Sequence, residues 1–388
     1  MEKKCCCSKP ANRQTPCGSG DDPNCLADAV TSAPVSAPVS TPVSTPWVTG
    51  RLETAVGEVP QIRTSLGWAD CIGGWKVRWG IGRMRYRVPP GLYAVGNPND
   101  ESPVLVTANY KLTFDRLRSQ LGGRDGWLVV LDTKGVNVWC SAAKGTFGTD
   151  EVVRRIEATR LSEVVSHSVL VLPQLSAVGV CAREVLKRTG FRPVFGPVCA
   201  TDLPAFLDAG MKTPEMRLVR FPLRDRLAVV PVELVQAAKK LLIVAAFFFL
   251  LAGLGSDGYS PGRLLSVGIP SAVVFLATSL GALVLGPAFL PYLPGRPFAL
   301  KGLWLGLFFS AVLVAGTSLA AVGVGDRLDL AAWCLMIPAV SSFLLMNFTG
   351  CTTFTSLSGV RREMRKALPI QIVVTVAGVG LWLAGRFV

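Results

Sequence analysis

The chain of 388 residues is half hydrophobic and carries a formal net charge of +14, with most of its charged residues before residue 240. Such an apolar fraction argues against a wholly soluble protein, and the two halves are expected to lie in different solvents. Nucleic-acid binding is not predicted, because the basic residues crowd the ends of apolar segments without an aromatic-interleaved patch or zinc-finger spacing. Eleven cysteines would suit a secreted disulfide protein. The charged N-terminus without a following apolar core instead predicts reduced cytosolic thiols.

Residues 1–46 are expected to form a disordered cysteine-rich tail and a proline-rich linker. Proline recurs at every fourth position from Pro34 to Pro46, a pattern that favours a semi-rigid polyproline II spacer. The tail also contains Cys5, Cys6 and Cys7 in succession, and adjacent thiolates bind soft metals well. Capture of Hg(II) is therefore one interpretation of this triplet, and lipidation or no role are the others.

Residues 47–235 carry alternating strand and helix signals. Gly126–Asp132 and Val169–Leu172 are predicted to be buried strands, and Val136–Trp139 a short extended piece. Thr149 is a plausible N-cap of a following helix, and Val180–Thr189 is predicted to be another helix. Alternation of this kind predicts a Rossmann-like α/β domain with a mostly parallel sheet, which binds ligands beyond the carboxyl ends of its strands.

Residues 236–388 are predicted to be an all-α transmembrane domain. Five apolar segments, roughly 241–255, 264–286, 302–324, 330–348 and 368–385, approach the ~20 residues that a spanning helix needs, although the first is short. Basic residues gather before the first segment, between the second and third, and between the fourth and fifth. This bias predicts a multi-pass protein of the cell inner membrane whose soluble domain and N-terminus are cytoplasmic and whose C-terminus lies outside.

The segment from Gly135 to Thr149 places one cysteine, Cys140, in a predicted loop of small residues before a helix. Small side chains let a large flat ligand approach the backbone, and a thiolate is the form of cysteine that binds metal. The alternative interpretation is a buried structural thiol, because free cysteine packs as a small hydrophobe.

This segment closely resembles the cap-helix motif of the family of mercury-methylating corrinoid proteins (HgcA). The similarity covers about residues 70–235 and extends, more loosely, to the large subunit of the corrinoid iron–sulfur protein. The matching pieces are Ser102–Lys111, Leu131–Thr133, Leu172–Leu175 and Phe195–Val198. A soluble corrinoid domain followed by five spans is also the layout of that family.

The resemblance implies a cobalamin-dependent methyltransferase. It implies a bound cobalamin or related corrinoid whose cobalt takes the Cys140 thiolate as its lower axial ligand, with Cys140 as the catalytic residue. The implied cofactor contacts are Asn137, Val138, Trp139, Cys140, Ala142, Lys144, Gly145, Thr146, Phe147, Gln174 and Gly196. Methyl transfer to Hg(II) would give methylmercury. Donation from a thiolate trans to the methyl group weakens the carbon–cobalt bond and favours departure as a carbanion equivalent.

The motif departs from the usual family pattern, Asn-Val/Ile-Trp-Cys-Ala-Ala/Gly-Gly-Lys, at Ser141 and Ala143. The added methyl group of Ala143 would crowd the corrin if backbone and ring touch there. The sequence has no iron–sulfur motif of the Cys-x-x-Cys kind, so the reductant must be another protein. By resemblance this partner is a ferredoxin-like iron–sulfur protein, and a methyl-pterin methyltransferase system is a candidate methyl donor.

Two other functions compete with mercury methylation. The first is a corrinoid methyl carrier in one-carbon and acetyl-CoA metabolism. The second is a transporter with a regulatory soluble domain, which is weakened because the spans lack an interior ionisable pair. The single histidine, His167, lacks the Asp-x-His-x-x-Gly pattern of many cobalamin proteins and is interpreted as a polar residue at a strand entrance.

Overall fold

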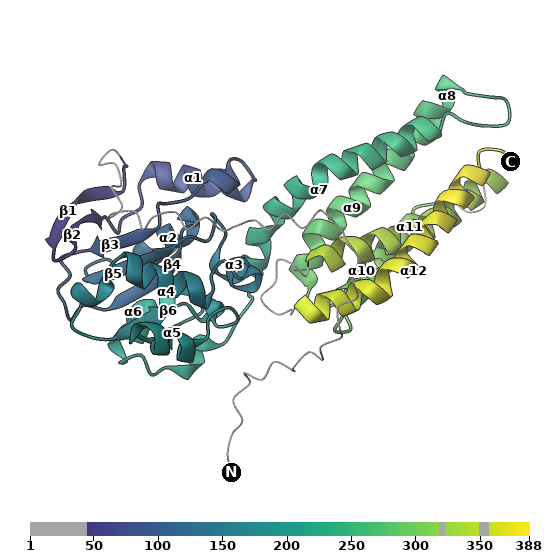
Figure 1. Ribbon diagram of the computed structural model, residues 1–388. Helices are drawn as coiled ribbons and strands as arrows, with labels where there is room; N and C mark the ends of the chain where they lie inside the picture. Colours follow the sequence, from purple (N-terminus) through teal and green to yellow (C-terminus); the bar gives the residue numbers. More distant parts are fainter. Residues whose placement is uncertain (1–44, 318–322, 349–356) are drawn as a thin grey trace, which may run out of the picture. The chain divides into compact units, whose positions relative to one another are not determined.

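The computed structural model describes residues 45–317, 323–348 and 357–388. An α/β domain comes first in the chain, and a series of long apolar helices follows it (Figure 1). The predicted fold class, a mixed α/β domain followed by a helical region, is confirmed.

The α/β domain is built on a seven-stranded sheet in the order β1-β2-β3-β5-β4-β6-β7. The strands are β1 (Val48–Thr54), β2 (Gly57–Ile62), β3 (Gly91–Val95), β4 (Val104–Ala108), β5 (Gly126–Leu131), β6 (Val169–Leu172) and β7 (Arg192–Phe195). Strands β5, β4, β6 and β7 are mutually parallel, and β2 is parallel to β3. The β1–β2 hairpin and the β3–β5 pair are antiparallel. The prediction of a mostly parallel sheet is therefore confirmed, with two antiparallel exceptions.

Helices bury both faces of the sheet. They are α1 (Trp68–Arg78), α2 (Lys111–Arg118), α3 (Val138–Lys144), α4 (Thr149–Ala158), α5 (Ala182–Thr189) and α6 (Leu203–Asp208). The central strand β5 is buried throughout, and its side chains alternate between two cores. Trp127 and Val129 pack with residues of α3, α4 and α5, whereas Leu128 and Val130 pack with residues of α2 and α6. This alternation produces a three-layer α/β domain.

The strongest local patterns predicted their elements well. Strands β5 and β6 coincide with the two predicted buried strands, and α5 ends at Gly190 in the left-handed conformation, with φ of 78°. Two expectations were wrong. Thr149 is the first residue of α4 rather than its N-cap, and its hydroxyl accepts a hydrogen bond from the Cys181 backbone N–H at 2.9 Å. Val136–Trp139 is not an extended piece, because α3 begins at Val138.

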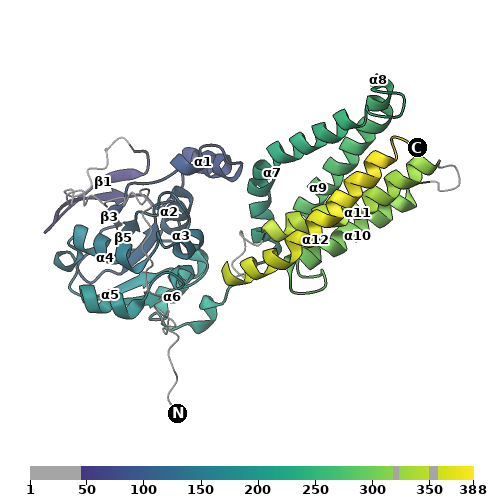
Figure 2. The same ribbon diagram turned by 45° about the vertical axis from the view of Figure 1, so that its right-hand side comes forward.

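Five of the described helices are long and apolar enough to cross a membrane (green to yellow in Figures 1 and 2). They are α7 (Leu223–Leu251), α9 (Ile269–Phe289, preceded by α8, Pro261–Arg263, and the π-helical turn Leu264–Gly268), α10 (Phe298–Ala315), α11 (Val324–Phe348) and α12 (Leu357–Ala384). The predicted number of spans is confirmed. Helix α7 begins ahead of the predicted segment and runs unbroken across residue 235, and the domain boundaries and the orientation stay predictions.

Close packing of α10 on α11 depends on two glycines. A Cβ atom on Gly302 would collide with the backbone of Ser341, and one on Gly306 would collide with the backbone of Pro338. Glycines four residues apart let two helix backbones approach closely, which is a common mode of packing between membrane helices.

Candidate functional site

A cavity of about 400 Å³ opens beyond the carboxyl ends of β4 and β6. Strand β4 leads into α2 on one face of the sheet, whereas β6 leads into α5 on the other face. The strand order therefore reverses between these neighbours, and open α/β sheets bind ligands at this kind of switch point. The walls that the α/β domain contributes come from both strands, from α2, from the start of α3, and from the segments after β6 and β7.

Four of the predicted site residues meet at this cavity: Asn137, Val138, Trp139 and Cys140 all line it. Cys140 is a half-buried free thiol, and it is the only cysteine among the described residues that line the cavity. It lies in the first turn of α3, so its predicted placement in a loop was wrong.

Asn137 starts α3 and thereby fixes the backbone of Cys140. The Asn137 side-chain oxygen accepts a hydrogen bond from the Cys140 backbone N–H at 2.9 Å. This bond satisfies one of the amide groups left free at a helix start, and it favours a helix over the extended conformation. Gly145 ends α3 in the left-handed region, with φ of 85°. The helix is consequently short, and only its first turn reaches the cavity.

The loop that leads into α3 is held by Asn109, a buried residue directly after β4. Its Oδ1 accepts hydrogen bonds from the backbone N–H groups of Thr133 at 3.1 Å and Gly135 at 2.9 Å. Its Nδ2 donates to a carboxylate oxygen of Asp132 at 3.1 Å. Gly135 has φ of 75°, which favours glycine at this turn. Sequence reasoning did not assign Asn109 a role, although a polar residue at the end of a buried strand was a usable signal.

The two departures from the family pattern take different environments. Ser141 is fully buried, and its hydroxyl donates to the carbonyl of Asn137, one turn earlier in the chain, at 2.6 Å. The extra hydroxyl is thus satisfied within α3. Ala143 is exposed and does not line the cavity, so its methyl group takes no space from the cavity.

The remaining predicted contacts of the α3 region lie outside the cavity walls. Ala142 and Phe147 are buried in the hydrophobic core shared with α4 and α5. Lys144 and Gly145 are exposed, and the Thr146 hydroxyl lies 3.4 Å from the Ser141 carbonyl. Because a helix turns its side chains through about 100° per residue, successive positions cannot all face one ligand.

Gln174 and Gly196 do not line the cavity, but their neighbours form the wall opposite α3. The neighbours of Gln174 in the chain, Pro173 and Leu175, line the cavity instead. The Gln174 Oε1 atom is buried and has no hydrogen-bond partner among the described residues. Gly196 donates its N–H to the Leu172 carbonyl at 2.7 Å, and a Cβ on it would lie 3.2 Å from Val171 Cγ1. A side chain at this position would press on the cavity wall.

No group of three or more His, Cys, Asp or Glu residues within the described ranges could hold a metal ion. A metal at Cys140 would therefore need most of its ligands from elsewhere, as a macrocycle provides. The Cys140 thiol and the mostly apolar walls fit a corrinoid, which carries cobalt on a large macrocycle. A complete cobalamin is larger than the cavity and would extend beyond it.

Two other metal-ligand candidates from the sequence lie away from this cavity or outside the residues that the structure describes. Cys5, Cys6 and Cys7, predicted to capture Hg(II), fall outside the described residues. His167 lies just before β6, where its Nε2 is 2.9 Å from the Ser102 carbonyl and its Nδ1 accepts from the Val169 N–H at 3.2 Å. Its interpretation as a polar residue at a strand entrance is confirmed.

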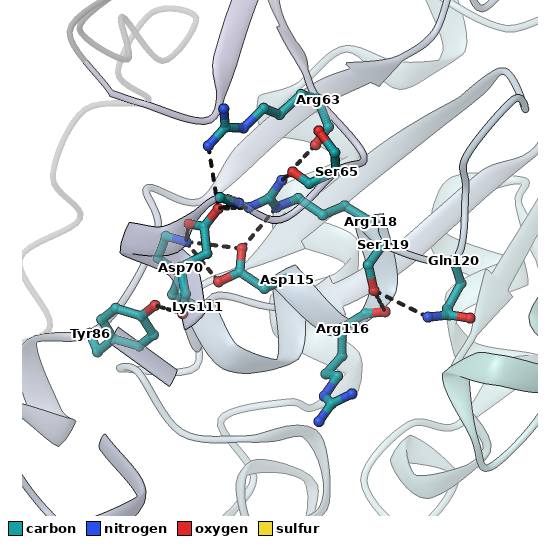
Figure 3. A network of polar contacts seen from close by, with 11 residues as sticks. Arg63, Ser65, Asp70, Tyr86, Lys111, Asp115, Arg116, Arg118, Ser119 and Gln120 are labelled. Atoms are coloured by element: carbon teal, nitrogen blue, oxygen red, sulfur yellow. Dashed lines mark hydrogen bonds and ion pairs between the residues drawn. The ribbon is translucent and has the colours of Figure 1, made fainter. Parts of the chain in front are cut away.

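A buried ion network ties α1 to α2 beside the sheet (Figure 3). Asp70 of α1 accepts hydrogen bonds from Lys111 Nζ at 2.6 Å and from Arg118 Nη2 at 2.8 Å, and Asp115 accepts from the same two cations. Burial opposes ionisation of Asp70, but hydrogen bonds from Lys111 and the Gly67 N–H, with the charges of Lys111 and Arg118, lower its pKa to about 2. The network therefore holds an ionised carboxylate.

Part of the α/β domain is similar to a known sequence family. Residues 82–204 match the family model described as the CO dehydrogenase/acetyl-CoA synthase delta subunit. The match includes most of the residues that line the cavity, but Val229, Val232 and Gln236 of α7 lie beyond it. The matched family is that of the large, or gamma, subunit of the corrinoid iron–sulfur protein, and this family binds a cobalamin-type corrinoid, in agreement with the predicted cofactor.

Two relatives illustrate the extent of the similarity. The acetyl-CoA decarbonylase/synthase complex subunit gamma of Archaeoglobus fulgidus is 38% identical over 128 residues, which are 32% of this chain and 27% of that protein. Its counterpart from Methanopyrus kandleri is 39% identical over 128 residues, with the same coverage. The chain thus spans about a quarter of the length of the curated relatives it matches. Mercury methylation is not among the activities that these names state, so the resemblance is supported at the level of the corrinoid iron–sulfur protein family.

Proposed function

We propose that the α/β domain binds a corrinoid in this cavity and acts as a methyl carrier. The observation that carries the proposal is the presence of Asn137, Trp139 and Cys140 on one cavity wall inside the segment that matches the corrinoid family. A bound corrinoid supplies a cobalt centre that can accept and release a methyl group. The chain's own residues would bind the cofactor, supply a ligand to its metal and limit access to it.

Cys140 is the residue that would supply the protein ligand to the cobalt. It is the one thiol among the described residues of the cavity, and Asn137 fixes its backbone through the first turn of α3. Because the turn is preceded by the loop that Asn109 holds, the sulfur is positioned by a rigid segment rather than by a free loop. Asn137, Val138 and Trp139 would contact the cofactor from the same wall.

The methyl acceptor that the comparisons favour is a partner in one-carbon metabolism. The relatives carry the name of acetyl-CoA decarbonylase/synthase complexes, so this chain would work with other protein subunits. A ferredoxin-like iron–sulfur protein would supply electrons, and a methyl-pterin methyltransferase system would supply the methyl group. The sequence contains no Cys-x-x-Cys motif, which supports the need for a separate reductant.

Hg(II) is the second candidate acceptor, and Cys140 is the observation that favours it. A thiolate is a soft and strongly donating ligand, and it would promote release of the methyl group toward an electrophile such as Hg(II). The sequence resemblance to mercury-methylating proteins points in the same direction. With this acceptor the protein would be an enzyme, a cobalamin-dependent methyltransferase that forms methylmercury.

We also propose that the five apolar helices anchor the domain in a cell inner membrane. The α/β domain, residues 47–235, would be cytoplasmic, and the C-terminus would lie outside. The basic residues at the start of α12, which are Arg361, Arg362, Arg365 and Lys366, support this orientation.

Spectroscopy of the full-length protein tests the cofactor proposal. Purified wild-type protein and the Cys140→Ala variant would be reconstituted with cobalamin and compared by visible absorption. We expect a spectrum of thiolate-ligated cobalt in the wild type only. Cys181→Ala is the matched control, because Cys181 is an exposed free thiol outside the cavity. Identical spectra for wild type and Cys140→Ala would refute thiolate ligation.

A labelled methyl group can identify the methyl acceptor. Protein loaded with labelled methylcobalamin would be mixed either with Hg(II) or with an acetyl-CoA-forming enzyme, and the labelled products would be separated. Methylmercury that forms with wild type and not with Cys140→Ala would support the second candidate. Label that stays on the protein with Hg(II) and passes to the enzyme would support the methyl carrier.

A further inference from the structure

Helix α1 turns its apolar face outward. Trp68, Ile72, Trp75 and Trp79 follow spacings of four, three and four residues, which place them on one side of a helix. Their exposed fractions are 86%, 47%, 60% and 38%, in that order. Beyond the helix, Ile81 and Met84 continue the exposed apolar surface. We call these six residues the tryptophan face.

The opposite side of α1 is held against the domain by charge. Asp70 is bound to Lys111 and Arg118, and Arg63 lies 3.6 Å from the same carboxylate (Figure 3). Gly74 and Val77 are buried on this side as well. The usual amphipathic arrangement is therefore inverted, because the acid faces inward and the tryptophans face outward. The ion network fixes this orientation.

The exposed charges of the segment that carries the tryptophan face, residues 66–87, are all positive. Lys76, Arg85 and Arg87 are exposed, and Arg78 and Arg83 are half-buried. The one acid between residues 66 and 87 is Asp70, whose side chain is 5% exposed and lies inside the network. The surface thus combines bare indole rings with cations, which is the composition of helices that lie in the interface of an anionic membrane.

We propose that the tryptophan face binds the headgroup region of an anionic lipid bilayer, with α1 lying in the plane of the membrane. Indole rings favour this region because one part of the ring is apolar and its N–H is polar. The chain also carries five helices long and apolar enough to cross a bilayer, so a bilayer is the partner that would lie within reach of this face. Attachment to these helices would keep the tryptophan face at a high effective concentration of lipid.

Docking of this face would act on the candidate site. Arg83, within the docked segment, lines the cavity that contains Cys140. A Cβ on Gly135, in the loop before α3, would lie 3.3 Å from the Met84 carbonyl. The segment that meets the lipid is therefore packed against the segment that carries the candidate site, and docking would hold the cavity close to the membrane surface. The lipid proposal does not require that the cavity bind a corrinoid.

Hydrogen exchange of the full chain in nanodiscs tests the proposal. One set of nanodiscs contains phosphatidylcholine alone, and the other contains phosphatidylcholine mixed with phosphatidylglycerol. We expect amides in residues 66–87 to exchange roughly tenfold more slowly in the anionic nanodiscs. The triple variant Trp68→Ser, Trp75→Ser, Trp79→Ser should lose this slowing. Reversal of the cations, Lys76→Glu with Arg85→Glu and Arg87→Glu, should remove the dependence on phosphatidylglycerol.

A matched control substitutes exposed apolar residues elsewhere on the same domain. Val178→Ser with Leu186→Ser should leave the slowing in residues 66–87 intact, since both side chains lie outside the tryptophan face. An unchanged midpoint of thermal unfolding will show that the triple variant is folded. Equal exchange of residues 66–87 in both kinds of nanodisc would overturn the proposal. Slowing that grows with protein concentration would also overturn it, because a second copy would then cover the face.

Discussion

Two short helices beside the sheet, α1 and α3, are held by buried side chains of different charge. Asn109 holds the loop before α3 through neutral hydrogen bonds to backbone amides, whereas Asp70 holds α1 through ion pairs. A neutral amide keeps its bonds across the ordinary pH range. A buried ion network depends on every member staying charged, since a lone buried charge is costly. The wall of the cavity that contains Cys140 is thus supported by the anchor that depends less on pH.

The largest expected effect comes from neutralising the charged anchor. Asp70→Asn leaves Arg118 fully buried and Lys111 mostly buried with one carboxylate fewer between them. Loss of one member of a buried ion network costs about 3–5 kcal/mol. We expect an equivalent drop in the unfolding free energy of the α/β domain, measured with urea. Arg124→Ala, which breaks an exposed ion pair with Asp208, is the control and should cost less than about 1 kcal/mol.

Breaking the neutral anchor should cost less but affect the cavity more. Asn109→Ala leaves the N–H groups of Thr133 and Gly135 without their acceptor, at a cost of about 2–3 kcal/mol. We expect weaker binding of cobalamin, measured by titration of its visible spectrum. Asp70→Asn should change that binding less. Unaltered binding in Asn109→Ala would show that the loop before α3 does not position the cofactor.

Acid should distinguish the two anchors without any mutation. The pKa of Asp70 in the folded protein is about 2, below its ordinary value of 3.8. A lowered folded-state pKa stabilises the protein above the unfolded-state value, and this contribution is lost as the pH falls from about 4 to about 2. The loss should reach roughly 2 kcal/mol. Unfolding measured across this window in wild type and in Asp70→Asn isolates the effect, because other carboxylates contribute to both proteins.

The smallest expected effect concerns the departure at position 143. Ala143→Gly restores the usual family residue at an exposed position of α3. Glycine in place of alanine in a helix costs about 0.5–1 kcal/mol. Because Ala143 does not line the cavity, cobalamin affinity should stay the same. A clear gain in affinity would show that the part of the cofactor outside the cavity contacts this face of α3.

The sequence predicted those elements whose signals are local and strong. The uniformly apolar runs of β5 and β6 and the left-handed glycine after α5 need no tertiary information. The five apolar helices follow from length and composition. The start of α3 was missed because Val136 and Val138 favour a strand, whereas the side chain of Asn137 caps a helix. A single capping bond outweighed the propensity of two β-branched residues.

The anchors and the limits of the site could not be predicted in the same way. Asp70 pairs with partners 41 and 48 residues away, and a charged residue by itself suggests a solvated surface. The motif around Cys140 was found by resemblance, but the resemblance did not show which positions face the cavity. That depends on where α3 begins and how it turns. Phe147, for example, is buried in the core, because the chain leaves α3 at Gly145.

The glycines of α10 bear on how the membrane half can move. With Gly302 and Gly306 against the backbone of α11, the two helices meet without side chains between them. If α10 slid along α11 or moved away from it, backbone contacts would be lost that no side-chain rotation could restore. Helices α10 and α11 are therefore expected to behave as one rigid unit. Any rearrangement inside the bilayer would then move α10 and α11 together.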